Sequence, residues 1–470
     1  MGPGYAYFDP GGSLQVRTVA ITTLGCKVNQ YDSEAIAAQF QKAGFEVVPF
    51  EDVADVYVIN TCTVTRMGDK KSRQFIRRAH SRNPDALIVA TGCYAQASPR
   101  EVAALPGVCV VSGTYDRERI VQAVLDFDES SRPSRRDSDV VGVNREVLEG
   151  RDVAPQVLVR ETSSFGPFEE LAVEGWTERT RAYVKIEDGC ENFCSYCKVP
   201  YVRGPVRSRD PRKIRKEIEL LASLGYREVV LTGIDLGAYG RDFGGSPDVA
   251  EILEAAASVE GIARVRLSSV DPTDVTEQLI STMADHVEVC PHLHIPLQSG
   301  SDTVLSLMNR RYTVSEYEDI VSMARERIPD LAVTTDVIVG FPGEDEEAFQ
   351  ATCDVCRRSR FSRMHVFQYS RRRGTVASTL PGQVSRIEKA RRSAELIALG
   401  GELSLGFHRQ LLGRSMSVLV EQADHEGFEG LTGNYVRVYA VGSALPGDIV
   451  NVCVSEADEG FVRGSIEELT

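Results

Sequence analysis

The sequence predicts an α/β protein in three parts: an N-terminal doubly wound parallel sheet, a central partial (β/α)6 barrel and a small C-terminal β-barrel. Three observations support this prediction. Apolar runs alternate with helical patterns through the first two parts, as they do in parallel sheets. After residue 413 the pattern changes to short alternating strands separated by turns. The 470 residues are too many for one ordinary core, so several domains are expected.

The N-terminal part, residues 17–126, is expected to form the doubly wound sheet. Strands are predicted at residues 17–23, 55–60 and 86–91, with helices over residues 32–43 and 69–80. Residues 1–16 lack the pattern of a signal peptide and are predicted to be a disordered tail. Residues 127–178 have the composition of a weakly structured linker.

The central part, residues 179–409, contains six strand candidates separated by helical stretches. They lie at residues 182–187, 228–232, 263–268, 292–297, 332–339 and 363–368. Six βα units in a row indicate a partial barrel, with functional groups at the C-terminal ends of its strands. A long helix is predicted over residues 385–412. Residues 410–470 then contain four predicted strands of a small barrel, at 417–421, 430–439, 448–455 and 461–465.

The composition excludes some classes of protein and favours others. The chain contains no apolar run long enough to cross a bilayer, so no membrane partner is expected. Eleven cysteines without an export signal indicate metal-binding or catalytic thiols in a reducing compartment rather than a disulfide framework. The protein is therefore expected in the cytoplasm, and we expect it to be a monomer.

Cys190, Cys194 and Cys197 stand at the spacing C-x3-C-x2-C, just after the first predicted barrel strand. Three closely spaced thiolates suit a [4Fe–4S] cluster in which one iron has no protein ligand. That iron can bind a substrate or cofactor directly. The alternatives are a zinc site and a chance group of core cysteines. Structural zinc prefers four ligands, however, and this loop offers no fourth Cys or His.

A second group of cysteines is predicted in the N-terminal part. Cys26, Cys62 and Cys93 each follow a predicted strand within three residues. The carboxyl ends of parallel strands share one edge of a sheet, where such folds bind ligands. The three thiols could therefore converge into a second site with an open iron. The alternative is three unrelated buried cysteines.

Polar motifs follow several barrel strands, at the edge that carries the cysteine loop. Glycines allow close backbone approach, and Asp, Ser and Gln can hydrogen-bond a ribose or an amino acid head group. A further motif, Gly-Phe-Pro-Gly-Glu, covers residues 340–344. The candidate cofactor-binding residues are Gly233, Asp235, Ser268, Asp271 and Gln298.

Basic residues are clustered despite the net charge of −15. Several clusters near the cysteines favour a polyanionic partner over ordinary solvated helix faces. The candidates for binding such a partner are Arg73, Arg77, Arg203, Arg207, Arg209, Arg310 and Arg311.

The C-x3-C-x2-C loop, with Tyr196 before its last cysteine, resembles the signature of radical S-adenosylmethionine (SAM) enzymes. Nearly the whole chain is similar to the methylthiotransferases, which end in a small β-barrel called TRAM. The motifs that carry this resemblance lie at residues 22–34, 60–65, 91–96 and 199–209. The variant Gly-Cys-Lys-Val-Asn-Gln at residues 25–30 is similar to the branch that modifies N6-threonylcarbamoyladenosine at position 37 of tRNA.

The resemblance implies two [4Fe–4S] clusters, one on each set of three cysteines, and SAM bound beside Tyr196. It implies methylthiolation of C2 of the tRNA adenine, with the basic residues binding the anticodon stem-loop. An electron donor and a sulfur source are then needed as partners. Two residues depart from the family pattern: Glu187 replaces the usual Gln, and Lys198 replaces an aliphatic residue.

Three alternatives stay open at this point. The substrate could be isopentenyladenosine at position 37 of tRNA, or an aspartate of ribosomal protein S12. The acidic composition of residues 410–470 fits the protein substrate, whereas the motif around Cys26 does not. The third alternative is a non-catalytic iron–sulfur protein that binds RNA.

Overall fold

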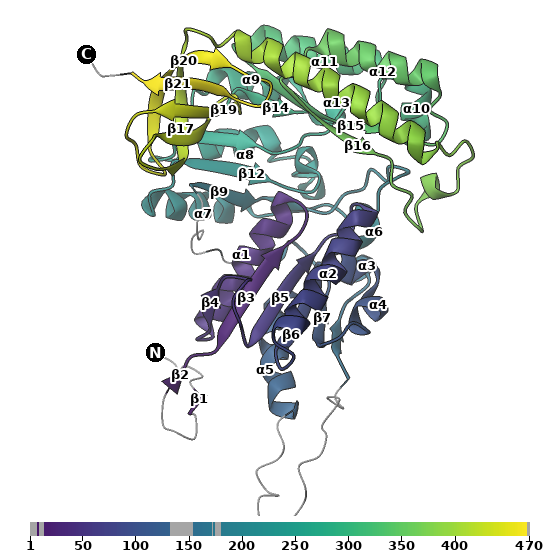
Figure 1. Ribbon diagram of the computed structural model, residues 1–470, viewed down its shortest axis with the longest axis vertical. Coiled ribbons are helices and arrows are strands. Elements are labelled where there is room, and N and C mark those ends of the chain that lie inside the picture. The colour runs from purple at the N-terminus through teal and green to yellow at the C-terminus, as the bar shows by residue number, and fades with distance from the viewer. Residues whose placement is uncertain (1–6, 9–13, 132–153, 172, 174–179, 468–470) are drawn as a thin grey trace, which may run out of the picture. The chain divides into compact units, whose positions relative to one another are not determined.

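The computed structural model describes residues 7–8, 14–131, 154–171, 173 and 180–467 (Figure 1). The chain divides into two compact units. The N-terminal unit comprises Met1–Val173 and Tyr201–Gly204, and the second unit comprises Glu174–Pro200 and Pro205–Thr470.

The N-terminal unit is built on a six-stranded parallel sheet with the order β4-β3-β5-β6-β7-β8. In chain order the strands are β3 Thr18–Thr23, β4 Glu46–Val48, β5 Val56–Thr61, β6 Leu87–Gly92, β7 Val108–Ser112 and β8 Gln156–Leu158. Every residue of β5 and β6 is buried, as central parallel strands covered on both faces must be. A separate antiparallel ribbon pairs β1 Tyr7–Phe8 with β2 Leu14–Gln15, within the range predicted as a tail.

Helices cover both faces of this sheet, which gives the predicted doubly wound arrangement (Figure 1). Their bounds are α1 Lys27–Lys42, α2 Arg66–Arg82, α3 Cys93–Ala97, α4 Pro99–Ala103 and α5 Ile120–Ser131. Phe40 of α1 and Val124 of α5 pack on one face, whereas Ile76 of α2 and Val102 of α4 pack on the other. Helix α1 begins five residues earlier than predicted, directly after Cys26.

Part of the range predicted as a linker is structured. Strand β8 adds an edge to the sheet, and Phe168 and Leu171 are buried. The hydroxyl of Tyr31 donates to the Leu171 carbonyl at 3.1 Å. Composition does not reveal β8 because it has three residues and none of them is fully buried. Residues 132–153 lie outside the described part of the chain.

The second unit contains the predicted partial barrel. Its six parallel strands are β9 Arg181–Lys185, β12 Glu228–Thr232, β13 Arg264–Leu267, β14 His292–His294, β15 Ala332–Val339 and β16 Arg363–Gln368. They form two three-stranded sheets, β13-β12-β9 and β14-β15-β16. Isolated parallel bridges, Val265 to Val289 and Ser269 to His294, connect the two sheets. The strands therefore follow the chain order around an incomplete barrel.

Helices and one short ribbon alternate with the barrel strands along the chain, and the end of α6 belongs to the N-terminal unit. The helices are α6 Val199–Arg203, α7 Pro211–Ser223, α8 Val249–Ala257, α9 Glu277–Asp285, α10 Asp302–Leu307, α11 Val314–Arg327, α12 Glu346–Ser359 and α13 Arg386–Arg409. Asp210, Asp248 and Asp345 cap three of them by accepting backbone N–H groups of the first turn. The ribbon pairs β10 Glu187–Asp188 with β11 Arg207–Ser208.

The C-terminal residues form a closed barrel with the strand order β17-β18-β19-β21-β20. The strands are β17 Ser415–Ala423, β18 Phe428–Thr432, β19 Arg437–Val441, β20 Ile449–Ala457 and β21 Val462–Ile466. The prediction of four strands was wrong, because residues 430–439 contain parts of both β18 and β19. A turn in which the Tyr435 N–H donates to the Thr432 carbonyl at 3.1 Å separates them.

A buried carboxylate joins the C-terminal barrel to the strands of the larger one. Glu228, at the start of β12, lies between Arg181 and Arg264 in the strand register, and Arg266 donates to it at 2.9 Å. Arg264 also donates to the Ser417 carbonyl at 2.6 Å, and Arg266 donates to the Gly433 carbonyl at 2.8 Å. The same arginines therefore hold Glu228 and the C-terminal barrel.

Replacing Glu228 with Gln is expected to lower the free energy of unfolding by about 3–5 kcal/mol, because buried guanidinium groups lose their shared carboxylate. Burial alone would raise the pKa of Glu228, but Arg266, Arg181 and Arg264 outweigh it and lower that pKa. The ionised carboxylate therefore stabilises the native state above the ordinary Glu pKa. This stability is lost as the pH falls through the lowered pKa of the folded state.

Urea unfolding at neutral and acidic pH measures this effect. Glu219→Gln is the matched control, since Glu219 pairs with Arg215 on the surface and should contribute less than about 1 kcal/mol. Equal effects of the two substitutions would show that Glu228 does not anchor the C-terminal barrel.

Candidate functional site: two groups of three cysteines

The N-terminal cysteines lie at the carboxyl ends of three neighbouring strands. Cys26 follows β3 and immediately precedes α1, Cys62 directly follows β5, and Cys93 directly follows β6. Because β3, β5 and β6 are adjacent in the sheet, the three residues come to one edge of it. Cys62 and Cys93 are buried, and Cys26 is exposed.

Glycines before two of these cysteines permit the close approach of the loops. Gly25 has a φ of +105° and Gly92 a φ of +91°, which residues with a Cβ rarely adopt. A Cβ on Gly25 would lie 3.0 Å from the Cys62 sulfur, and one on Gly92 would lie 2.3 Å from Oδ1 of Asn60. A side chain at Gly25 would therefore press against the Cys62 thiol, and Gly92 has no room for a side chain.

Gly92→Ala is expected to destabilise the native state by about 1–3 kcal/mol from backbone strain, with the clash against Asn60 adding to it. Thermal unfolding of the purified variant measures the change. Gly225→Ala is the control, because Gly225 also has a φ of +91° but nothing lies within 4 Å of its added Cβ. A loss in the control as large as that of Gly92→Ala would rule out the steric contribution.

The Asn29 side chain ties two of the cysteine loops together. Its amide nitrogen donates to the carbonyl of Leu24 at 2.7 Å and to that of Thr61 at 3.1 Å. These carbonyls lie just before Cys26 and Cys62. Asn29 was not among the predicted site residues, although its place in the first turn after Cys26 was the available signal. Its role depends on Thr61, 32 residues away.

The N-terminal thiols influence one another electrostatically. Burial, followed by the nearby Cys93 thiol and with a smaller effect of Cys26, raises the pKa of Cys62 to about 12. The Val64 N–H donates to the Cys62 sulfur at 3.5 Å, and this hydrogen bond lowers the pKa of Cys62 and so reduces the increase. A buried thiol that resists ionisation, with two other thiols beside it, suits a cationic ligand, because the charge of that ligand stabilises the thiolate form.

The barrel cysteines lie on an irregular loop between β10 and α6. Ser195 anchors this loop: its N–H donates to the Met308 carbonyl at 2.9 Å, and its hydroxyl to the Leu307 carbonyl at 2.7 Å. The Ala377 N–H donates to the Ser195 carbonyl at 2.8 Å. Residues of the barrel far along the chain therefore hold the loop in place.

Two charged side chains contact the barrel thiols. The Cys190 thiol donates to the Asp235 carboxylate at 3.5 Å, and Arg310 donates to the Cys194 sulfur at 3.5 Å. Arg310 also forms an ion pair of 2.7 Å with Asp271. Burial, and then the charge of Asp235, raises the pKa of Cys190.

The polar residues predicted to bind a cofactor lie at the carboxyl ends of barrel strands. Gly233 and Asp235 follow β12, Ser268 and Asp271 follow β13, and Gln298 lies beyond β14. Here the hydroxyl of Ser268, Oε1 of Gln298 and Oε1 of Glu187 are buried without a hydrogen-bond partner among the described residues. Because unpaired polar atoms in an interior are costly, this edge suits a polar ligand that would pair with them.

Glu187 is buried in contact with this edge and departs from the family pattern noted above. Its Oε2 accepts the N–H of Asp235 at 2.8 Å, and a Cβ on Gly233 would lie 2.6 Å from the same oxygen. Burial raises the pKa of Glu187 well above its ordinary value. A protonated Glu187 has the shape of Gln and can both donate and accept hydrogen bonds.

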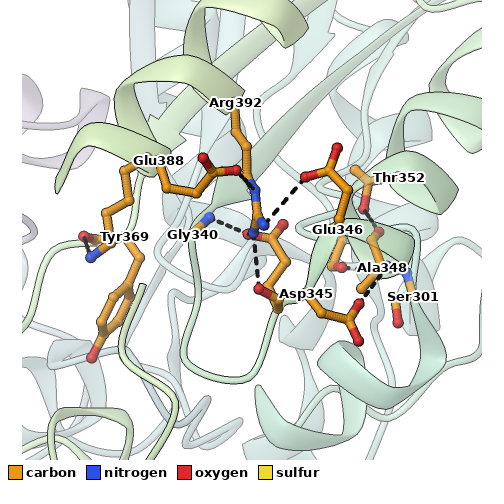
Figure 2. Close-up of polar contacts among 12 residues, drawn as sticks. Ser301, Gly340, Asp345, Glu346, Ala348, Thr352, Tyr369, Glu388 and Arg392 are labelled. Carbon is orange, nitrogen blue, oxygen red and sulfur yellow. Dashed lines mark hydrogen bonds and ion pairs between the residues drawn. The ribbon is translucent and has the colours of Figure 1, made fainter. Parts of the chain in front are cut away.

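Helix α13 holds the loop of residues 340–344 that follows β15 (Figure 2). Arg392 donates to the Glu344 carboxylate at 3.0 Å and to the Glu344 carbonyl at 2.9 Å. Within this loop, the Phe341 ring makes an edge contact with the Tyr196 ring, with centroids 6.4 Å apart. Helix α13 therefore holds the loop whose Phe341 ring packs against Tyr196, in the cysteine loop.

Both groups fit an iron–sulfur cluster by the chemistry of their donors. Each offers three thiols on loops at strand ends, and thiolates are the ligands that such clusters prefer. Within the described ranges, no group of three or more Cys, His, Asp or Glu side chains is arranged to hold a metal ion. The fit of the two cysteine groups to a cluster therefore rests on the number and chemistry of their thiols and on their place after strands.

The structure separates the seven predicted RNA-binding arginines into two groups. Arg73 is partly exposed, and Arg77 and Arg311 are exposed, so these three are accessible to a partner. The other four do not fit that prediction, because their side chains are buried against carboxylates: Arg203, Arg207, Arg209 and Arg310. A basic cluster in the sequence does not distinguish the groups, because burial depends on carboxylate partners that lie anywhere from 8 residues away, for Arg209, to 171 residues away, for Arg203.

Comparisons with known proteins agree with this architecture. A model of the radical SAM superfamily matches residues 184–356, and a model described as uncharacterized protein family UPF0004 matches residues 18–113. The fold is similar to that of the radical SAM methyltransferase TsrM from Kitasatospora setae, solved with cobalamin and a [4Fe-4S] cluster. The TM-score is 0.53 at 17% identity, and the match covers 77% of each chain. The fold and the cysteine loop thus define the class as radical SAM.

Curated relatives extend over almost the whole chain. The threonylcarbamoyladenosine tRNA methylthiotransferase MtaB of Bacillus subtilis is 43% identical over 96% of this chain and 98% of its own. The Aquifex aeolicus protein of the same name is 39% identical over 93% of this chain and 100% of its own. A tRNA-2-methylthio-N(6)-dimethylallyladenosine synthase of Acidothermus cellulolyticus is 36% identical, covering 94% of this chain and 86% of its own. The chain belongs to the radical SAM methylthiotransferase family.

The comparisons confirm the predicted family and fold class. As a member, the chain is a transferase. In the part of the chain that the structure describes, no helix combines the length and apolar character needed to cross a membrane.

Proposed function

We propose that this protein methylthiolates C2 of N6-threonylcarbamoyladenosine at position 37 of tRNA, giving the 2-methylthio derivative. The observation that carries the proposal is the pair of three-cysteine groups at strand ends in a chain of this family. The substrate is supported by the relatives: those named for threonylcarbamoyladenosine are 37–43% identical, and those named for dimethylallyladenosine 34–36%.

Two [4Fe–4S] clusters and SAM are the cofactors of this proposal. When bound, they supply the radical that activates C2 and the sulfur and methyl group that are transferred. Cys190, Cys194 and Cys197 would hold the cluster that binds SAM, and Cys26, Cys62 and Cys93 would hold the second cluster. Ser268 and Gln298 would pair their free polar atoms with SAM. Gly233 would allow close approach of the backbone, while Asp235 orients the loop of Cys190.

The tRNA would bind through its anticodon stem-loop, with Arg73, Arg77 and Arg311 contacting phosphates. An electron donor and a sulfur source are the other expected partners. We expect the enzyme to act as a monomer. Its expected location is the cytoplasm, where tRNA is modified.

Mass spectrometry of tRNA nucleosides from cells with and without this protein tests the proposal. The 2-methylthio-N6-threonylcarbamoyl nucleoside should disappear when the protein is absent and return when it is restored. Loss of the isopentenyl derivative instead would show that the substrate is isopentenyladenosine. If no tRNA nucleoside changed, the proposal would be wrong, and ribosomal protein S12 would be the next substrate to analyse.

A further inference from the structure

A buried arginine holds one cysteine of the N-terminal group. Arg203 ends α6, belongs to the N-terminal unit and is 0% exposed. Its Nε donates to the Cys93 sulfur at 3.4 Å, and its Nη1 donates to the Asp32 carboxylate at 3.3 Å. Its Nη2 donates to Oδ1 of Asn29. The planar guanidinium therefore has partners in three different directions.

The charge of Arg203 is compensated within the same network. The Asp32 carboxylate also pairs with Arg117 at 2.8 Å, and Arg117 pairs with Glu169 at 2.5 Å. Two guanidinium groups thus face two carboxylates, all of them buried. The contact with Cys93 is therefore a directed hydrogen bond from a charged donor, and it does not depend on a surplus positive charge.

Arg203 is also linked to the loops of the other two cysteines through the side chain of Asn29. The Asn29 amide that accepts from Arg203 donates to the carbonyls of Leu24 and Thr61. These carbonyls immediately precede Gly25-Cys26 and Cys62. One guanidinium thus binds a thiol directly and orients the amide that holds the remaining two loops.

We propose that Arg203 is a positioning residue of the N-terminal cysteine group, and that its Nε hydrogen bond to Cys93 sets the reduction potential and the retention of the iron–sulfur cluster held there. This inference rests on the proposed function, which assigns a cluster to these cysteines. Hydrogen bonds to cluster sulfurs are among the factors that set reduction potentials. Partners that orient metal ligands typically contribute about 10- to 100-fold to metal affinity.

The barrel group offers a reciprocal control within the same chain. Arg310 donates to the Cys194 sulfur at 3.5 Å and pairs with Asp271. Each group of cysteines therefore has a buried arginine on one of its sulfurs. Replacing Arg310 should alter only a cluster on the barrel cysteines.

The test uses the full-length protein with Cys190 and Cys197 replaced by Ala, so that only the N-terminal group binds a cluster. After anaerobic reconstitution, iron content, the rate of iron loss to a chelator and the reduction midpoint potential are measured. Arg203→Met should shift the potential to more negative values and speed iron loss by about 10- to 100-fold. Arg310→Met in the same protein should change neither quantity.

Arg203→Lys keeps the positive charge but cannot reproduce the three-way geometry of the guanidinium. It should shift the potential in the same direction as Arg203→Met, and it serves as the test variant if Arg203→Met does not fold. A potential and an iron-loss rate equal to those of the parent in both Arg203 variants would overturn this assignment alone. Absence of iron from the parent protein would overturn the proposed second cluster as well.

Discussion

Replacing Cys62 with Ala is expected to abolish methylthiolation of tRNA while the reduced enzyme still forms 5′-deoxyadenosine from SAM. Cys62 lies at the end of β5, where its buried thiol is influenced by those of Cys93 and Cys26. Its loss removes one ligand of the proposed second cluster and leaves the three barrel cysteines unchanged. Anaerobic assays that quantify 5′-deoxyadenosine and the methylthio nucleoside from the same reaction measure both outcomes.

Cys109→Ala is the matched control for this prediction. Cys109 is a buried cysteine of β7 in the same sheet, and its thiol donates to the Ile88 carbonyl at 3.3 Å. Its replacement removes a thiol from the core without touching the predicted cluster, so both products should form. Full methylthiolation by Cys62→Ala would show that the N-terminal cysteines are ordinary core residues.

Cys194→Ala is expected to abolish both products, because SAM cleavage precedes methylthiolation in the proposed reaction. The Cys194 sulfur accepts a hydrogen bond from Arg310 in the loop anchored by Ser195. Reconstituted protein should retain about four irons per chain, those of the N-terminal cluster. Iron analysis and the same product assays measure the change.

The control for the barrel is Cys353→Ala, since Cys353 is buried in α12 and has no assigned ligand role. This variant should form both products and bind about eight irons per chain, as two [4Fe–4S] clusters require. Formation of 5′-deoxyadenosine by Cys194→Ala at the rate of the control would exclude the C-x3-C-x2-C loop as the SAM site.

Much of the architecture was predictable because its signals are local. The β5 and β6 strands are largely apolar runs. Asp248 and Asp345 are residues typical of helix N-caps, so they indicate where α8 and α12 begin. Strand β8 was not predictable, since its three residues form a strand only by pairing with β7, where each partner lies 46 positions earlier in the chain. Short edge strands depend on their neighbours more than on their own residues.

In the candidate site, too, some features follow from local sequence and others depend on contacts with residues elsewhere in the chain. The order of strands and cysteines along the chain was enough to place Cys26, Cys62 and Cys93 together, because a cysteine just after a parallel strand comes to the carboxyl edge of its sheet. The roles of the arginines, in contrast, depend on tertiary contacts that the basic clusters do not reveal. Arg77 and Arg203 are alike as residues in basic clusters, yet one is exposed and the other is buried against Cys93 and Asp32. A guanidinium becomes buried only where partners compensate its charge and fill its hydrogen bonds, and for Arg203 one of these partners, Asp32, lies 171 residues away in the chain.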